Sequence, residues 1–95
     1  MRLNSALKAE FGGTDNERQV ILRAVQDLAD SEKPSRDRGH ALTVPGICRH
    51  LADAPNDNSL VERWNWWMGA LETAYGGYDY FTVRFIEGDE PGLHR

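Results

Sequence analysis

The stretch from Ser59 to Glu87 constrains the fold of this chain more than any other part of the sequence. It contains all three tryptophans, all three tyrosines and two of the three phenylalanines of the 95 residues. Aromatic side chains can bury roughly 150 to 250 Å² each, so they dominate the energetics of a small core. We therefore expect the rest of the chain to pack around this stretch.

The first half of the stretch predicts a helix that Asn58 or Ser59 caps and that runs to about Tyr75. Ser59 and Glu62 have the spacing of a capping box, in which a hydroxyl and a carboxylate bond the free N–H groups of the first turn. Gly76 is well placed to end the helix, because positive φ suits glycine. Apolar residues recur at steps of three and four, which predicts a core-facing stripe: Leu60, Trp64, Trp67, Met68, Leu71 and Tyr75.

Trp66 lies on the opposite side of this predicted helix, about 200° from Trp64. Its neighbours on that side are small or charged: Glu62, Arg63, Gly69, Ala70 and Thr73. A large aromatic residue in such surroundings is typical of an anchor for a partner protein. The alternative is that another element of the same fold covers the indole. Trp66, Arg63 and Thr73 are therefore candidate partner-binding residues.

The second half of the stretch predicts a strand from Tyr78 to Glu87. Apolar and polar side chains alternate there, and aromatic and β-branched residues are frequent. The partner of this strand is open: the short run His40–Val44, a hairpin with residues near Tyr75, or the same strand of a second chain. The last arrangement would give a homodimer. Tyr80 and Arg84, on the polar face, complete the set of candidate partner contacts.

Two further helices are expected upstream. Leu3, Leu7 and Phe11 are spaced by four and predict a short helix that Gly12-Gly13 ends. Thr14 and Glu17 form a second capping box, and the helix that follows should run from about Asp15 to Glu32. Its polar residues should face outward: Arg18, Arg23, Gln26, Asp27 and Asp30.

The middle of the chain reads as a polar linker followed by another short helix. Pro34 should end the preceding helix, and Pro34–His40 contains no apolar residue other than the proline. Thr43 is a plausible N-cap for a helix that reaches Leu51. The linker carries the local cluster of basic side chains, which are candidate nucleic-acid contacts or simply solvated charges: Lys33, Arg36, Arg38 and His40.

These elements predict an α+β fold that is mostly helical. Three to four helices would pack with a C-terminal strand in a sheet of two or three strands, all in one domain over residues 1–95, with 88–95 as a flexible tail. The element order resembles a winged helix-turn-helix. In that resemblance Thr43–Leu51 would be the first helix of the motif, Ser59–Tyr75 the recognition helix and Tyr78–Glu87 the wing.

Composition and spacing argue against several kinds of chemistry. The net charge of −4 disfavours a broad phosphate-binding surface. Cys48 is the single cysteine, which excludes an intramolecular disulfide, and no run of residues has the length and apolarity of a membrane span. Cys48 and His50 would point apart on a helix, so they form neither a chelate nor a catalytic pair. We expect a cytoplasmic protein without catalytic residues, cofactor or metal.

Two functions remain after these exclusions. The leading hypothesis is a small acidic protein-interaction module, of the kind phages and mobile elements use as inhibitors or adaptors, that binds a larger protein through an aromatic surface. The alternative is a winged helix-turn-helix regulator that binds DNA. A groove-reading helix needs cationic and amide side chains, whereas the outward face around Trp66 carries more acid than base. Another protein is therefore the expected partner, nucleic acid is less favoured, and no membrane contact is expected.

Overall fold

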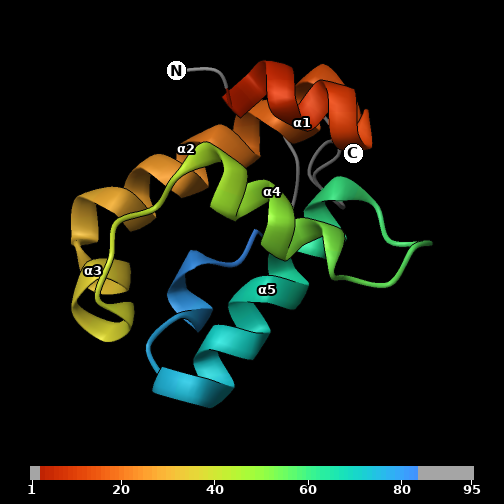
Figure 1. The fold of residues 1–95 in the computed structure, drawn as a ribbon. Coiled ribbons are helices and arrows are strands. Elements are labelled where there is room, and N and C mark those ends of the chain that lie inside the picture. Colours follow the sequence, from red (N-terminus) through yellow and green to blue (C-terminus); the bar gives the residue numbers. More distant parts are fainter. Residues whose placement is uncertain (1–2, 84–95) are drawn as a thin grey trace, which may run out of the picture.

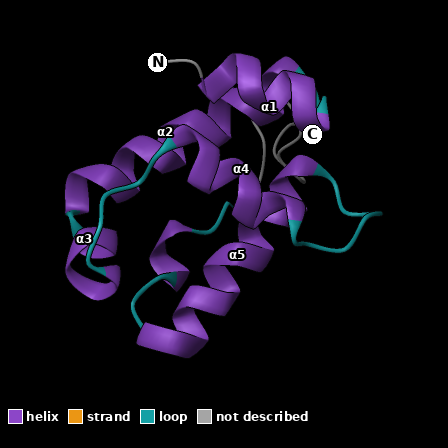
Figure 2. Ribbon diagram, viewed as in Figure 1, coloured by secondary structure: helices purple, strands orange, loops and turns teal. Residues whose placement is uncertain are grey.

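The computed structural model describes residues 3–83, and Figures 1 and 2 show that this part of the chain is built from helices and loops alone. Five α-helices are followed by a short 3₁₀ helix: α1 Leu3–Phe11, α2 Asp15–Ser31, α3 Lys33–Arg38, α4 Val44–Ala52, α5 Leu60–Tyr75 and η1 Asp79–Phe81. The predicted α+β class is therefore wrong. Over the described residues the fold is all-α.

Helix α2 connects most of the structure. It packs against α1, α3, α5 and η1, while α5 packs against α2, α4 and η1, and α1 reaches α4. In Figure 1 the loop after α3 crosses in front of α2 and brings α4 back to the centre of the molecule. The shared core is aliphatic with aromatic residues from the C-terminal third: Leu3, Leu7, Ile21, Val25, Leu28, Ile47, Leu51, Leu60, Trp64, Trp67, Met68, Leu71 and Tyr78.

The four helices predicted from periodicity are confirmed, and so are their caps. Thr14 and Ser59 each accept a hydrogen bond from the amide three residues later, and the carboxylates of Glu17 and Glu62 bond back to the cap amides. Thr43 caps α4 through a bond from the amide of Gly46. These caps are local interactions, so a sequence pattern is enough to identify them.

Arg18 is the main departure in the N-terminal half, because the prediction placed it on the surface and the structure buries it. Its side chain is only 5% exposed. The guanidinium donates to the carbonyls of Gly12 and Gly13 and to Oδ1 of Asn4, and it forms an ion pair with Asp15. The α1–α2 turn leaves two carbonyls without helical partners, and Arg18 satisfies them.

The predicted linker Pro34–His40 is wrong in its first part, because Lys33–Arg38 is the short helix α3. Glu32 separates α2 from α3 with a left-handed backbone, φ 60° and ψ 10°. Pro34 lies in the first turn of α3, where its missing N–H costs nothing. The sequence predicts Pro34 as the stop of the preceding helix, whereas the structure ends α2 at Ser31 and places Pro34 in the first turn of α3.

The predicted strand Tyr78–Glu87 is also wrong over its described part, since Asp79–Phe81 is a 3₁₀ turn. Side chains of α5 satisfy the backbone of this segment in place of a neighbouring strand. The amides of Tyr78 and Asp79 donate to Glu72, and the carbonyl of Phe81 accepts from Nε1 of Trp64. Residues 84–87 of the prediction lie outside the described residues.

No second strand is available to the segment among residues 3–83. The run from His40 that was a candidate partner is irregular up to Thr43, and Val44 already belongs to α4. Consequently residues 3–83 contain no sheet, no wing for a winged helix-turn-helix, and no free strand edge for the homodimer that was one of the three alternatives.

Candidate functional site

Trp64, Asn65, Trp66 and Trp67 form the tetrapeptide around which the candidate site is built. Trp64 is completely buried, and its Nε1 donates to the carbonyl of Phe81 over 2.9 Å. Its ring meets Trp67 edge to face, with ring centres 5.5 Å apart and planes at 89°. Trp64 therefore joins the core to η1 through both apolar contact and a hydrogen bond.

Asn65 holds the chain after η1 against α5. Its Nδ2 donates to the carbonyl of Val83 and its Oδ1 accepts from the amide of Val83, both over 2.8 Å. One side-chain amide thus provides the pair of hydrogen bonds that a neighbouring strand would otherwise provide. This is the local reason why Val83 needs no partner in a sheet.

Trp67 completes the inner side of the tetrapeptide. It is buried, and His50 of α4 stacks on it with ring centres 4.8 Å apart and an angle of 10° between planes. Nε2 of His50 also lies 2.9 Å from Nη2 of Arg38. Because arginine can only donate, His50 is the acceptor and is held as a neutral imidazole.

Trp66 differs from these three, because it remains 40% exposed. Every residue that shares its side of α5 over the next two turns is exposed too: Gly69, Ala70 and Thr73. Glu62, one turn before Trp66, is exposed as well. We call these five residues the outer face of α5. A Cβ added at Gly69 would meet no atom within 4 Å, so the surface beside the indole is open.

Two of the other candidate partner contacts are engaged within the domain. Arg63 donates to the carbonyls of Leu51 and Asn56, and its guanidinium lies over the ring of Phe11, 5.0 Å from the centre. Thr73 donates to the carbonyl of Gly69. Arg63 therefore ties the loop after α4 to α5, while Thr73 stays on the outer face.

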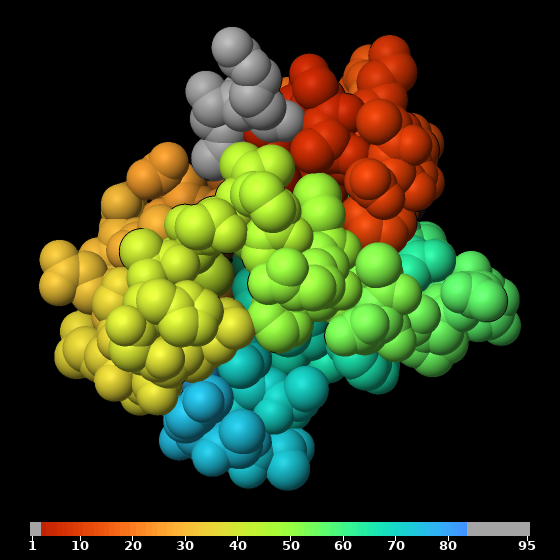
Figure 3. Space-filling view, viewed as in Figure 1, coloured from red at the N-terminus to blue at the C-terminus, as the bar shows by residue number. Residues whose placement is uncertain are grey.

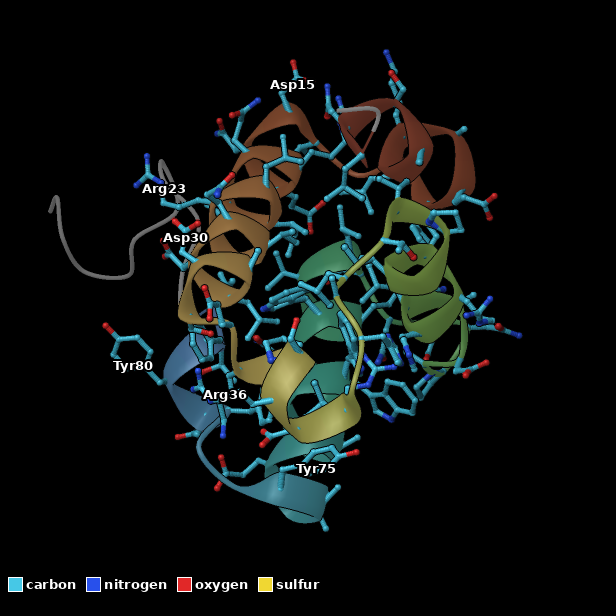
Figure 4. All side chains as sticks on the ribbon, turned by 60° about the vertical axis from the view of Figure 1, so that its left-hand side comes forward. Asp15, Arg23, Asp30, Arg36, Tyr75 and Tyr80 are labelled. Atoms are coloured by element: carbon cyan, nitrogen blue, oxygen red, sulfur yellow. The ribbon has the colours of Figure 1, made fainter. Side chains whose placement is uncertain are left out.

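Tyr80 is the most exposed large aromatic residue, at 86%, and Figure 4 shows its ring projecting away from the helices. With Phe81, Thr82 and Val83 it lines an open groove of about 420 Å³ against α2. The structure therefore groups Tyr80 with α2 and not with Trp66. Arg84, the last candidate contact, lies outside the described residues.

Tyr75 also departs from its predicted place in the core stripe. It is 48% exposed at the C-terminal end of α5, near α3 in Figure 4. Tyr78 takes the interior position instead, completely buried, with its hydroxyl donating to Asp37 over 3.0 Å. Burial, followed by the hydrogen bond to Asp37, raises the pKa of Tyr78 to about 12.

The four candidate nucleic-acid contacts separate into two groups. Lys33 pairs with Asp37 at 3.0 Å and lies over the ring of Tyr78, and Arg36 donates to the carbonyl of Ser31. Arg38 and His40 instead line a pocket of about 130 Å³.

Two basic residues of that pocket were not among the sequence candidates, namely Arg49 and His50 of α4. Nothing local marks them, because they lie about a dozen positions from Arg38 and only the crossing of the loop brings α4 beside α3. In Figure 3 this face is turned toward the viewer, with α3 in yellow beside α4 in yellow-green. The pocket therefore depends on tertiary structure alone.

None of the helices within residues 3–83 is both long and apolar enough to cross a membrane. Within the same range, no three side chains of His, Cys, Asp or Glu gather in a way that could hold a metal ion.

Comparison with known proteins gives the chain a family. Neither the curated proteins nor the solved structures contain a match. A family model described as the WNWW domain matches residues 1–72, and the one-letter sequence of residues 64–67 is WNWW. The match covers Trp64 and Asn65 but ends before Phe81 and Val83, which these two side chains bind. The chain belongs to the WNWW domain family.

Proposed function

We propose that this domain binds another protein through the outer face of α5, with Trp66 as the anchor, and that the bound surface of the partner is cationic. The domain would act as an adaptor or inhibitor, because binding requires only this surface.

The observation that carries the proposal is that the side chains of residues 64–67 have different surroundings. Trp64 and Trp67 fill the core, and Asn65 holds Val83. Trp66 is the one residue of the four that is exposed, with 40% of its surface in solvent. Exposed indoles are costly in water and are strongly enriched among residues that dominate binding energy.

The surroundings of Trp66 suit close approach by a partner. Gly69 and Ala70 follow it at one helical turn, so a flat and sterically open strip lies beside the ring. Binding sites of this type combine a central aromatic anchor with neighbours that exclude water. The outer face has this composition over two turns of α5.

Charge around the outer face specifies the chemistry of the partner. Glu62 is exposed at one end, and the neighbouring loop, which Arg63 reaches at Asn56, carries the exposed carboxylates of Asp53 and Asp57. The guanidinium of Arg63 turns inward to the carbonyls of Leu51 and Asn56. An apolar centre with an acidic rim complements an apolar patch bordered by lysine and arginine.

Site-specific photocrosslinking tests the proposal. A photoreactive amino acid replaces Ala70 on the outer face, and a control protein carries it at Asp27, exposed on α2. We expect a defined protein to be crosslinked from position 70 and not from position 27. Trp66→Ala should abolish the product and Tyr80→Ala should leave it, since Tyr80 lies on another surface.

Four outcomes would contradict this proposal. Equal crosslinking from both positions would show nonspecific contact, and a product formed by two copies of the domain would show self-association. A partner whose contact surface is acidic would also contradict the charge argument, as would binding that strengthens with added salt.

A further inference from the structure

The pocket between the α3–α4 loop and α4 has the size of a small anion. Its volume is about 130 Å³, against roughly 30 Å³ for one water molecule, so the pocket has room for a phosphate group. Polar and apolar side chains share the lining: Arg38, His40, Ala41, Leu42, Thr43, Gly46, Ile47, Arg49, His50 and Trp67.

The charged groups at this pocket are almost all basic, although the chain has a net charge of −4. Arg38 and Arg49 both line it, and neither forms an ion pair within residues 3–83, where the ion pairs are Arg18–Asp15 and Lys33–Asp37. Arg38 uses one donor on His50, and Arg49 is exposed. Several guanidinium donors therefore remain available.

Arg38 is held in place before any ligand arrives. Trp67 is buried, His50 stacks on it, and Arg38 bonds to His50, so a chain of contacts leads from the core to the guanidinium. A group that is already oriented loses little conformational entropy when it binds. The amide of Gly46 in the first turn of α4 is already bonded to Thr43, so the pocket depends on side chains rather than on the helix end.

We propose that this pocket binds a phosphate-sized oxyanion, with Arg38 and Arg49 as its charged hydrogen-bond donors. Guanidinium groups suit this task because they present several N–H donors in a plane and form strong charge-assisted bonds to phosphate oxygens. Free phosphate and the phosphate group of a small ester share this chemistry. The site is separate from the outer face of α5 and does not depend on the proposed partner.

His50 should report on the bound anion. Burial lowers the pKa of His50, and the charges of Arg38, Arg49 and His40 lower it further, whereas Asp53 opposes them. The α5 residue packed on its ring is the uncharged Trp67. An anion beside these groups offsets the cationic charge, so it should raise the pKa of His50.

Linkage then gives the direction of the pH dependence. If the anion raises the pKa of His50, protonation of His50 must strengthen anion binding by the same factor. Protonated His50 can no longer accept from Arg38, which frees that donor for the ligand. Affinity should therefore increase as the pH falls through the titration of His50.

The test is a titration followed by nuclear magnetic resonance at constant ionic strength, with sodium sulfate, sodium phosphate and O-phosphoserine against sodium chloride. Sulfate keeps its charge between about pH 5 and 8, so the His50 titration can be read without ligand protonation. We expect saturable shifts at Arg38, Arg49 and His50, and a higher pKa of His50 in sulfate.

Charge-matched variants make the test specific. Arg49→Ala removes an exposed side chain that forms no ion pair within residues 3–83, so the fold should persist, and we expect at least a tenfold weaker affinity for sulfate and phosphate. Arg23→Ala removes the same charge from α2, where Figure 4 shows Arg23 on the outside, and should change affinity less than twofold. Arg38→Ala should weaken binding as strongly as Arg49→Ala.

The proposal would be overturned by shifts that do not saturate, by equal losses in Arg49→Ala and Arg23→Ala, or by a pKa of His50 that is the same in sulfate and chloride. Tighter binding of O-phosphoserine than of phosphate would identify an ester as the ligand, and the reverse order would identify the free ion. Either order supports the site.

Discussion

Trp64 and Trp66 are two positions apart on α5 and have opposite surroundings. Trp64 is completely buried and bonds to the backbone of η1, whereas Trp66 leaves 40% of its surface in solvent beside Gly69 and Ala70. The residue type is the same, so the side of the helix alone decides the difference. The inner side of α5 packs into the core, and the outer side, with Trp66, faces solvent.

Polar side chains of α5 also determine how the predicted strand segment is held. Asn65, at the border of the inner side, holds Val83 with two hydrogen bonds, and Glu72 does the same for the amides of Tyr78 and Asp79. Polar side chains of α5 thus act as the neighbour that the predicted strand lacked. The following changes test how sharply the inner and outer sides differ.

The largest effect should come from Trp64→Ala. Removing a buried tryptophan leaves a cavity and deprives the carbonyl of Phe81 of its donor, so we expect a loss of about 3 to 5 kcal/mol in unfolding free energy. Chemical denaturation measures this loss. A cost below about 1 kcal/mol would contradict the central role of Trp64 in the core.

Asn65→Ala should be intermediate, at about 1 to 3 kcal/mol. The substitution leaves both the amide and the carbonyl of Val83 without a partner while removing little apolar surface. Hydrogen exchange should show faster exchange of the Val83 amide, with α2 amides changed only in line with global stability. Unaltered protection at Val83 would mean that another group holds this segment.

Tyr78→Phe should cost about 1 kcal/mol near neutral pH, because it removes the hydrogen bond to Asp37 and keeps the ring. The pH dependence is more specific. Folding raises the pKa of Tyr78 to about 12, so its stabilising contribution is complete below the ordinary value of 10.0 and is lost as pH rises toward 12. Denaturation between these values should show a steeper decline for the wild type than for the variant.

Trp66→Ala should have the smallest effect on stability, within about 0.5 kcal/mol, because the side chain lies on the outer face. Its effect on binding should be large, with a loss of about 2 kcal/mol or more in binding free energy, equivalent to about thirtyfold in affinity. Denaturation and a binding assay on the same preparation give both values. A large loss of stability would show that Trp66 supports the core as Trp64 does, and would contradict the difference between the two sides of α5.

How far the sequence predicts this protein depends on whether the deciding contacts are local. The four longer helices, their caps and the outward position of Trp66 all follow from residues within two turns of one another, and the structure confirms them. The alternation of apolar and polar residues in Tyr78–Glu87 is an equally local pattern. Its interpretation as a strand is wrong over the described residues, because a strand also needs a partner that can be distant in the sequence.

The candidate sites divide in the same way. Trp66 can be found from a helical wheel, whereas the pocket of Arg38, Arg49 and His50 requires α3 and α4 to lie side by side. Arg18 is a further residue whose position the sequence does not predict. Its charge favours a position on the surface, but hydrogen bonds to the carbonyls of Gly12 and Gly13 hold its side chain in the interior.

The sequence by itself determined the helices, because helical periodicity, capping boxes and glycine stops act over a few residues. Tertiary structure alone decided how the segment after Gly77 is held, which cations share a pocket and that no sheet forms among residues 3–83. The physical reason is that backbone groups and charges must find partners, and any residue that folding brings near can serve, whatever its distance along the chain.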